Sequence, residues 1–140
     1  MDHYIYLEVL KYFRNAVERG EKIVPVSVNV SRVTISSPDF LDFYIDNKRK
    51  YGIGDDFIML ELTESFALDD NNSIKEIVEK LHKNGIKCSL DDFGSGFSSF
   101  NVLKSIQFDE LKLDRCFIEK TDNPEKDEIV LKMVIEMAKS

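Results

Sequence analysis

Four short apolar segments recur along the chain, and a longer segment with helical periodicity separates each from the next. Charged and turn residues bound these segments, which is typical of short strands. We predict strands over residues 24–30, 57–62, 86–90 and 109–113. Their spacing of about 20 to 35 residues is the length of a strand joined to a crossover helix. The sequence therefore predicts an α/β fold with about four parallel strands.

The first two helices are expected on either side of the strand at residues 24–30. Apolar residues recur with a helical period between residues 4 and 18, and Gly20 ends this pattern. The side chains predicted to point inward are Tyr6, Leu10, Phe13 and Val17. The second helix is announced by Ser37 as its N-cap and by Pro38 as its first residue, and it ends near Gly52.

Similar signals mark the later helices. Ser73 and Glu76 form a capping-box pattern, which opens a helix that Gly85 ends. A short helix is expected over residues 98–104, and a last one after Asn123-Pro124. The last helix has five apolar positions predicted to point inward, namely Ile129, Val130, Met133, Val134 and Met137. Such a repeat closes as a doubly wound sheet or as a barrel, and local sequence does not choose between them.

Polar residues end each predicted strand, at the edge where parallel α/β folds bind their ligands. They are Asn29, Glu61, Asp91, Asp92, Lys112 and Asp114. A single residue of this kind is more often a cap or turn residue, but four successive strands that end this way favour a shared site. Amide and carboxylate oxygens without histidine or thiolate suit Mg²⁺ or Mn²⁺ better than zinc.

Such a cluster implies metal-assisted hydrolysis of a phosphate ester. Two cations held by shared carboxylates can activate water and neutralise charge on a phosphoryl group. Lys112 would orient that water or stabilise the charge of the transition state. A site that only binds its ligand could use the same carboxylates, so both interpretations stay open.

The formal net charge of -7 argues against binding to DNA or RNA polymers, which requires a surplus of Lys and Arg. It is compatible with a small phosphorylated ligand. No apolar run reaches the roughly 20 residues that cross a bilayer, so we expect no membrane contact from this segment and a cytoplasmic location. Whether a longer natural protein is tethered to a membrane stays open. Cys88 and Cys116 are expected to be buried, reduced thiols.

Four motifs resemble those of the EAL family of bacterial cyclic di-GMP phosphodiesterases. They are the asparagine strand at residues 28–31, the ELTES segment at 61–65, the DDFGSGFSS loop at 91–99 and the LKLDR strand at 111–115. Their order and spacing agree with the family along nearly the whole chain. Ser95 and Phe97 stand where the family loop has Thr and Tyr, which are mild departures.

The resemblance implies a TIM-type (β/α)₈ barrel and a role for each strand-end residue. Asn29, Glu61, Asp91 and Asp92 would be ligands of Mg²⁺ or Mn²⁺, two ions in the complete domain. Lys112 would contact the nucleophilic water, and Asp114 would belong to the same catalytic group. Coupling between the site and the dimer would involve Glu64, Phe93, Gly94, Ser95 and Gly96.

The family also has a strand bearing the Glu of its name before these motifs, and an EGVE strand and a glutamine strand after them. Residues 8–10 imitate the naming motif but lie in a helical pattern. Because a complete barrel needs roughly 250 residues, we expect residues 1–140 to form a partial EAL domain with the central strands only. Unpaired sheet edges favour association, so we expect a homo-oligomer.

The parent domain is therefore expected to hydrolyse cyclic di-GMP to the linear dinucleotide, and the isolated chain to have negligible activity. The alternative is a catalytically inactive cyclic dinucleotide sensor or a protein-interaction module. A response-regulator receiver also combines acidic residues with a lysine, but its acidic pair lies near the first strand, whereas Asp91 follows two earlier strands.

Overall fold

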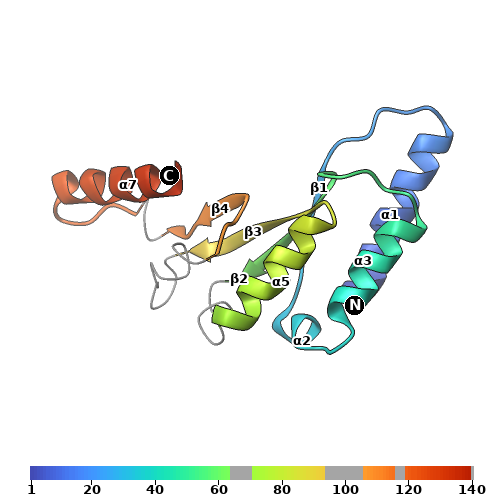
Figure 1. The fold of residues 1–140 in the computed structure, drawn as a ribbon. Coiled ribbons are helices and arrows are strands. Elements are labelled where there is room, and N and C mark those ends of the chain that lie inside the picture. Colours follow the sequence, from blue (N-terminus) through green and yellow to red (C-terminus); the bar gives the residue numbers. More distant parts are fainter. Residues whose placement is uncertain (64–70, 94–105, 116–118, 140) are drawn as a thin grey trace.

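The computed structural model describes residues 1–63, 71–93, 106–115 and 119–139 (Figure 1). The strands are β1 (Val26–Asn29), β2 (Ile58–Thr63), β3 (Ile86–Phe93) and β4 (Glu110–Leu113). The helices are α1 (Asp2–Glu18), α2 (Arg32–Ile35), α3 (Phe40–Lys50), α5 (Asn71–Lys83) and α7 (Pro124–Lys139). The strands pair in the order β1-β2-β3-β4, and all three pairings are parallel. The predicted α/β fold is confirmed.

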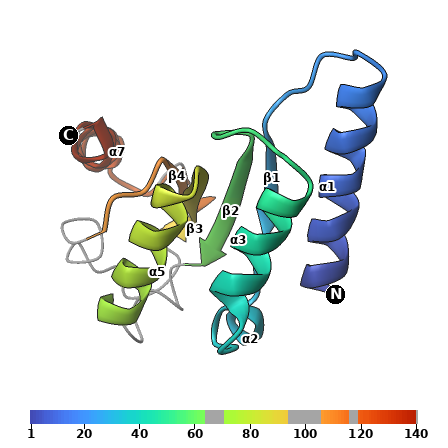
Figure 2. The same ribbon diagram turned by 45° about the vertical axis from the view of Figure 1, so that its right-hand side comes forward.

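Helices α1, α3 and α5 lie side by side and cover one face of the sheet (Figure 1, Figure 2). Alternate residues of the two central strands are buried on that face, namely Ile58, Leu60, Leu62, Ile86, Cys88 and Leu90. They pack against Tyr6, Leu10 and Phe13 of α1 and against Ile74, Val78 and Leu81 of α5. Helix α7 lies beyond β4, at the end of the sheet away from α1 (Figure 2).

The inward face of α1 differs from the prediction at its last turn. Tyr6, Leu10 and Phe13 are fully buried, but Val17 is 58% exposed and the neighbouring Ala16 is buried instead. Val17 lines a surface pocket of 250 Å³ together with Ile23. Periodicity identified the correct helix but could not show where the core stops along it.

Two predicted helix starts are wrong. Helix α3 begins at Phe40, and Ser37 donates a side-chain hydrogen bond to Asp39 in the preceding turn, where Pro38 also lies. A short helix that was not predicted, α2, takes Ser31 as its N-cap. Helix α5 begins at Asn71, so Ser73 lies inside its first turn. Capping residues cluster in this chain, and tertiary packing selects among them.

The start of α7 is as predicted, because Asn123 precedes it and its side-chain oxygen accepts a hydrogen bond from the backbone N–H of Lys126 at 3.2 Å. Its buried face is narrower than predicted. Val134 is 4% exposed, whereas Ile129, Val130 and Met133 are 55%, 47% and 66% exposed. The sheet ends at β4, so the helix has a core on one side only. In the described parts of the chain, no helix is long and apolar enough to cross a membrane.

Candidate functional site

A row of polar residues crosses the sheet on the face turned away from α1, α3 and α5. The strand register pairs Asn29 with Glu61, Glu61 with Ser89, and Ser89 with Glu110, so these four residues are lateral neighbours on successive strands. Neighbouring strands lie about 4.8 Å apart. The register therefore brings two of the predicted ligand residues, Asn29 and Glu61, next to each other.

Lys112 connects the outer strand to this row. Its ammonium donates a hydrogen bond to the Glu61 carboxylate and lies 3.9 Å from an oxygen of Glu110. The Glu61 side chain is 8% exposed, so this lysine is an important partner for a carboxylate that is nearly removed from water. The hydrogen bond to Glu61 raises the pKa of Lys112, and the charges of Glu61, Glu110 and Asp91 raise it further against a smaller burial effect. Lys112 is therefore a cation at neutral pH.

Asp91 and Asp92 form a β-bulge in β3. Leu90 pairs with Leu111 and Phe93 pairs with Leu113, so two residues of β3 stand opposite one residue of β4. Asp92 has a φ of 56°, a left-handed conformation that Asp tolerates better than most residues. Asp91 accepts a hydrogen bond from the Asp92 backbone N–H at 3.0 Å.

The bulge decides which side chains face the core. Simple alternation would turn Asp92 toward the helices, but Asp92 is exposed and Phe93 is fully buried in the core. Asp91 stays on the polar face, where its charge acts on Lys112. No local signal in the sequence predicted this irregularity, because it depends on how β3 pairs with β4.

The predicted site residues are only partly gathered. Asn29, Glu61, Lys112 and Asp91 form one connected neighbourhood, and the Asp114 backbone N–H donates to the Phe93 carbonyl at 2.9 Å. Among the described residues, no group of three or more His, Cys, Asp and Glu side chains is arranged to hold a metal ion. The oxygen donors nevertheless have the chemistry that Mg²⁺ and Mn²⁺ require.

Several expected features lie outside the described residues. These are Glu64, Gly94, Ser95 and Gly96, together with Cys116 and the predicted helix at residues 98–104. Phe93 is described and belongs to the core. Ser89 and Glu110 are the residues that sequence reasoning missed. Both precede the carboxyl ends of their strands, and only the register showed that they continue the row of Asn29 and Glu61.

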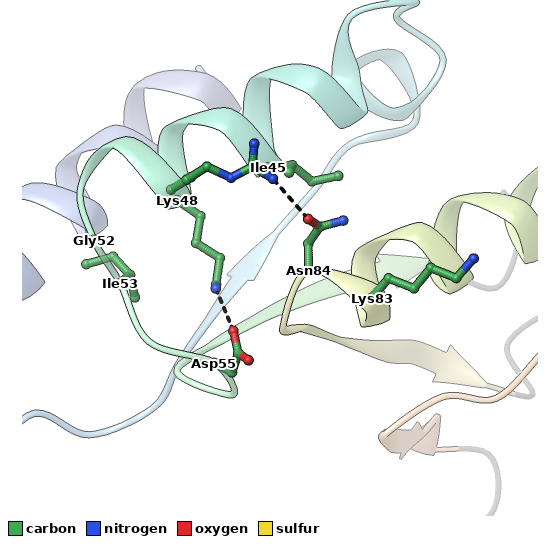
Figure 3. A pocket seen from close by; sticks show the side chains of 8 residues that line it. Ile45, Lys48, Gly52, Ile53, Asp55, Lys83 and Asn84 are labelled. Carbon is green, nitrogen blue, oxygen red and sulfur yellow. Dashed lines mark hydrogen bonds and ion pairs between the residues drawn. The ribbon is translucent and has the colours of Figure 1, made fainter.

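A separate pocket of 440 Å³ lies at the other end of the strands, beside the loops that precede β2 and β3 (Figure 3). The ammonium of Lys48 enters it and contacts Asp55 at 3.0 Å, and Arg49 donates to Asn84 at 3.5 Å. Helices α3 and α5 end here, so the basic side chains complement the partial negative charge of helix C-termini. The position of these basic side chains at helix C-termini therefore explains the charge of the pocket.

Comparisons with known proteins identify the family of the chain. The family model of the EAL domain matches residues 1–140. The signaling protein YkoW of Bacillus subtilis is 33% identical over 80% of the chain, and the matched part is 14% of the length of YkoW. The cyclic di-GMP phosphodiesterase PdeA of Borreliella burgdorferi is 31% identical over 99% of the chain, which spans 20% of that protein.

Solved structures show the same fold. The EAL domain of Mycobacterium smegmatis DcpA superposes with a TM-score of 0.81 at 28% identity, and 98% of the chain covers 62% of that structure. A complex of the PaMucR phosphodiesterase with c-di-GMP gives a TM-score of 0.82 at 26% identity, and 98% of the chain covers 56% of it. The open four-stranded sheet is thus part of a TIM-type barrel. The chain belongs to the EAL domain family.

Proposed function

We propose that residues 1–140 form the central part of an EAL domain that hydrolyses cyclic di-GMP to the linear dinucleotide with Mg²⁺ or Mn²⁺. The observation that carries the proposal is the row of Asn29 and Glu61 beside the Glu61–Lys112 hydrogen bond, at the carboxyl ends of neighbouring parallel strands. Two similar proteins support the substrate, because one is named a cyclic di-GMP phosphodiesterase and the other is a phosphodiesterase in complex with c-di-GMP.

In this proposal, Asn29, Glu61, Asp91 and Asp92 hold the cations. Bound there, a pair of divalent cations would supply activated water and would neutralise charge on the scissile phosphate. Lys112 orients the water and stabilises the developing negative charge, for which its positive charge at neutral pH is suited. Asp114 assists from the end of the same strand. Glu64 and the residues from Phe93 to Gly96 couple the site to dimerisation.

The chain alone is expected to hydrolyse cyclic di-GMP negligibly, because four strands do not complete a barrel. A chimera tests the parent activity: this chain replaces the corresponding segment of the PaMucR phosphodiesterase, with which it shares a TM-score of 0.82. We expect Mn²⁺-dependent conversion of cyclic di-GMP to the linear dinucleotide, measured by chromatography. Glu61→Ala should abolish it.

Glu79→Gln is the matched control, since it removes an exposed carboxylate on α5 and should leave the rate unchanged. A folded chimera that binds cyclic di-GMP but does not hydrolyse it would contradict the proposal. It would favour a sensor instead. Loss of activity in both variants would show that the chimera responds to charge in general and would also contradict the assigned role of Glu61.

We further propose that the isolated chain self-associates through its sheet edges. Beside β1, the α1 side chains Tyr4, Ile5 and Tyr12 line an apolar pocket of 320 Å³ with Val26. Tyr4, Ile5 and Tyr12 are 67%, 43% and 58% exposed, so they form a contiguous exposed apolar patch of the kind that marks interaction surfaces. Light scattering should give a mass above that of one chain. A stable monomer at micromolar concentration would contradict self-association.

A further inference from the structure

One ammonium group in the site has two carboxylate partners within reach. Lys112 donates to Glu61, two strands away, and lies 3.9 Å from Glu110 on its own strand. The two carboxylates differ in surroundings, because the Glu61 side chain is 8% exposed and the Glu110 side chain is 43% exposed. The buried carboxylate holds the lysine in this structure.

A divalent cation and this ammonium compete for Glu61. Like charges that share one carboxylate repel each other strongly at such short range. Lys112 occupies the Oε1 atom of Glu61, so a cation that takes this oxygen displaces the ammonium. The proposed function also requires Lys112 to stay near the reacting water, so it needs a second anchor close by.

Glu110 is placed to be that anchor. It stands in the polar row beside Ser89, whose hydroxyl donates to the same Glu110 oxygen that faces Lys112, at 3.5 Å. Ser89 is fully buried, so its position is set by the packing of β3. The hydrogen bond from Ser89 therefore orients the Glu110 carboxylate toward the Lys112 ammonium.

We propose that Glu110 is a positioning residue that receives the Lys112 ammonium when a divalent cation takes the Glu61 carboxylate. This inference rests on the proposed function, because it requires a cation at Glu61. Glu110 itself does not bind the cation. By giving Lys112 a second partner, it lowers the cost of freeing Glu61 and keeps the positive charge at the site.

A double-mutant cycle on Mn²⁺ affinity tests the inference in the 140-residue chain. The electron paramagnetic resonance signal of free Mn²⁺ gives the dissociation constant without any assay of activity. Lys112→Met removes the competitor and should tighten binding. Glu110→Gln keeps the acceptor for Ser89 but removes the charge that attracts Lys112, and it should weaken binding by about tenfold, a coupling typical of groups in contact.

The decisive comparison is Glu110→Gln in the Lys112→Met background. If Glu110 acts through Lys112, its substitution there should change Mn²⁺ affinity by less than about twofold, since the partner is gone. Glu79→Gln, which removes the same charge from the outer surface of α5, should have no effect in either background. Thermal unfolding of each variant checks that the fold is intact.

The outcomes separate the two proposals. An equal effect of Glu110→Gln in both backgrounds would show that Glu110 acts directly on the cation, and an absence of effect in the wild-type background would show that it does not act at all. Either result overturns the inference and leaves the metal site standing. Failure of both the wild-type and the Lys112→Met chain to bind Mn²⁺ would overturn the metal site and the inference together.

Discussion

The ammonium of Lys112 on β4 donates a hydrogen bond to the carboxylate of Glu61 on β2, although β3 lies between the two strands. Lys112→Met would leave Glu61 buried without this partner. We expect the free energy of unfolding to fall by about 1 kcal/mol at pH 7, the lower part of the usual range because Lys112 is 44% exposed. Urea unfolding measures the change.

The pH dependence of this contribution follows from the raised pKa of Lys112. Its ordinary value is 10.5, so the stabilisation is fully present below that pH and is lost as pH rises through the raised value. The difference between wild type and Lys112→Met should therefore shrink only above about pH 10.5. Lys132→Met is the control, because Lys132 pairs with Glu128 on an exposed surface and its loss should leave the free energy of unfolding nearly unchanged at any pH.

Gly85 and Gly52 form a matched pair for a test of steric crowding. Both have positive φ, 74° and 66°, but a Cβ at Gly85 would lie 2.0 Å from an Asp55 oxygen, while nothing lies within 4 Å at Gly52. Gly52→Ala should cost about 1 kcal/mol from backbone strain. Gly85→Ala should cost about 2 to 3 kcal/mol, since it also displaces Asp55 from the buried Lys48. Equal costs in thermal unfolding would contradict this account.

Tyr6 and Tyr44 test the value of a buried hydroxyl. The Tyr6 hydroxyl donates to the Tyr44 carbonyl at 2.7 Å, whereas the Tyr44 hydroxyl is buried and makes no hydrogen bond with any described residue. Tyr6→Phe should destabilise the chain by about 1 kcal/mol, and Tyr44→Phe should be neutral or stabilising. Denaturant unfolding of the two variants gives the comparison, and a large loss in Tyr44→Phe would reveal a partner for its hydroxyl.

Cys88 should be chemically inert in the folded chain. Burial raises the pKa of its thiol to about 12, and the charge of Asp109 adds to the effect. The folded thiol thus keeps its proton where the unfolded thiol loses it, so this group contributes less stability as pH rises above the ordinary thiol pKa of 9.0. In a Cys116→Ser chain, reaction with a thiol reagent at pH 8 should be no faster than unfolding. Rapid labelling without unfolding would contradict the buried position.

The sequence predicted the strands well because alternation and turn residues are local signals. All four predicted strands exist, and only their ends differ by a few residues, as for β3, which continues to Phe93. Helix starts were less predictable. Ser37 and Ser73 both carry good capping chemistry, yet α3 begins after the first and α5 before the second. Several residues near each start could cap, and packing of the helix on the sheet decides.

Helix α7 shows that periodicity also predicts buried residues only in part. Its apolar positions recur with a helical period, but Val134 is buried while Met133 is 66% exposed. Periodicity reports which residues share a face, and burial depends on what lies opposite that face. The prediction that Val17 of α1 points into the core was wrong for the same reason.

By itself, the sequence determined four parallel strands whose carboxyl ends carry Asn29, Glu61, Asp91 and Lys112, because strand alternation and strand polarity place such residues at one edge. Only the tertiary structure decided which of them meet. The contact of Lys112 with Glu61 depends on the register of three strands, and the bulge formed by Asp91 and Asp92 depends on pairing with a strand distant in sequence. Register and bulges arise from long-range pairing, so no local pattern contains them.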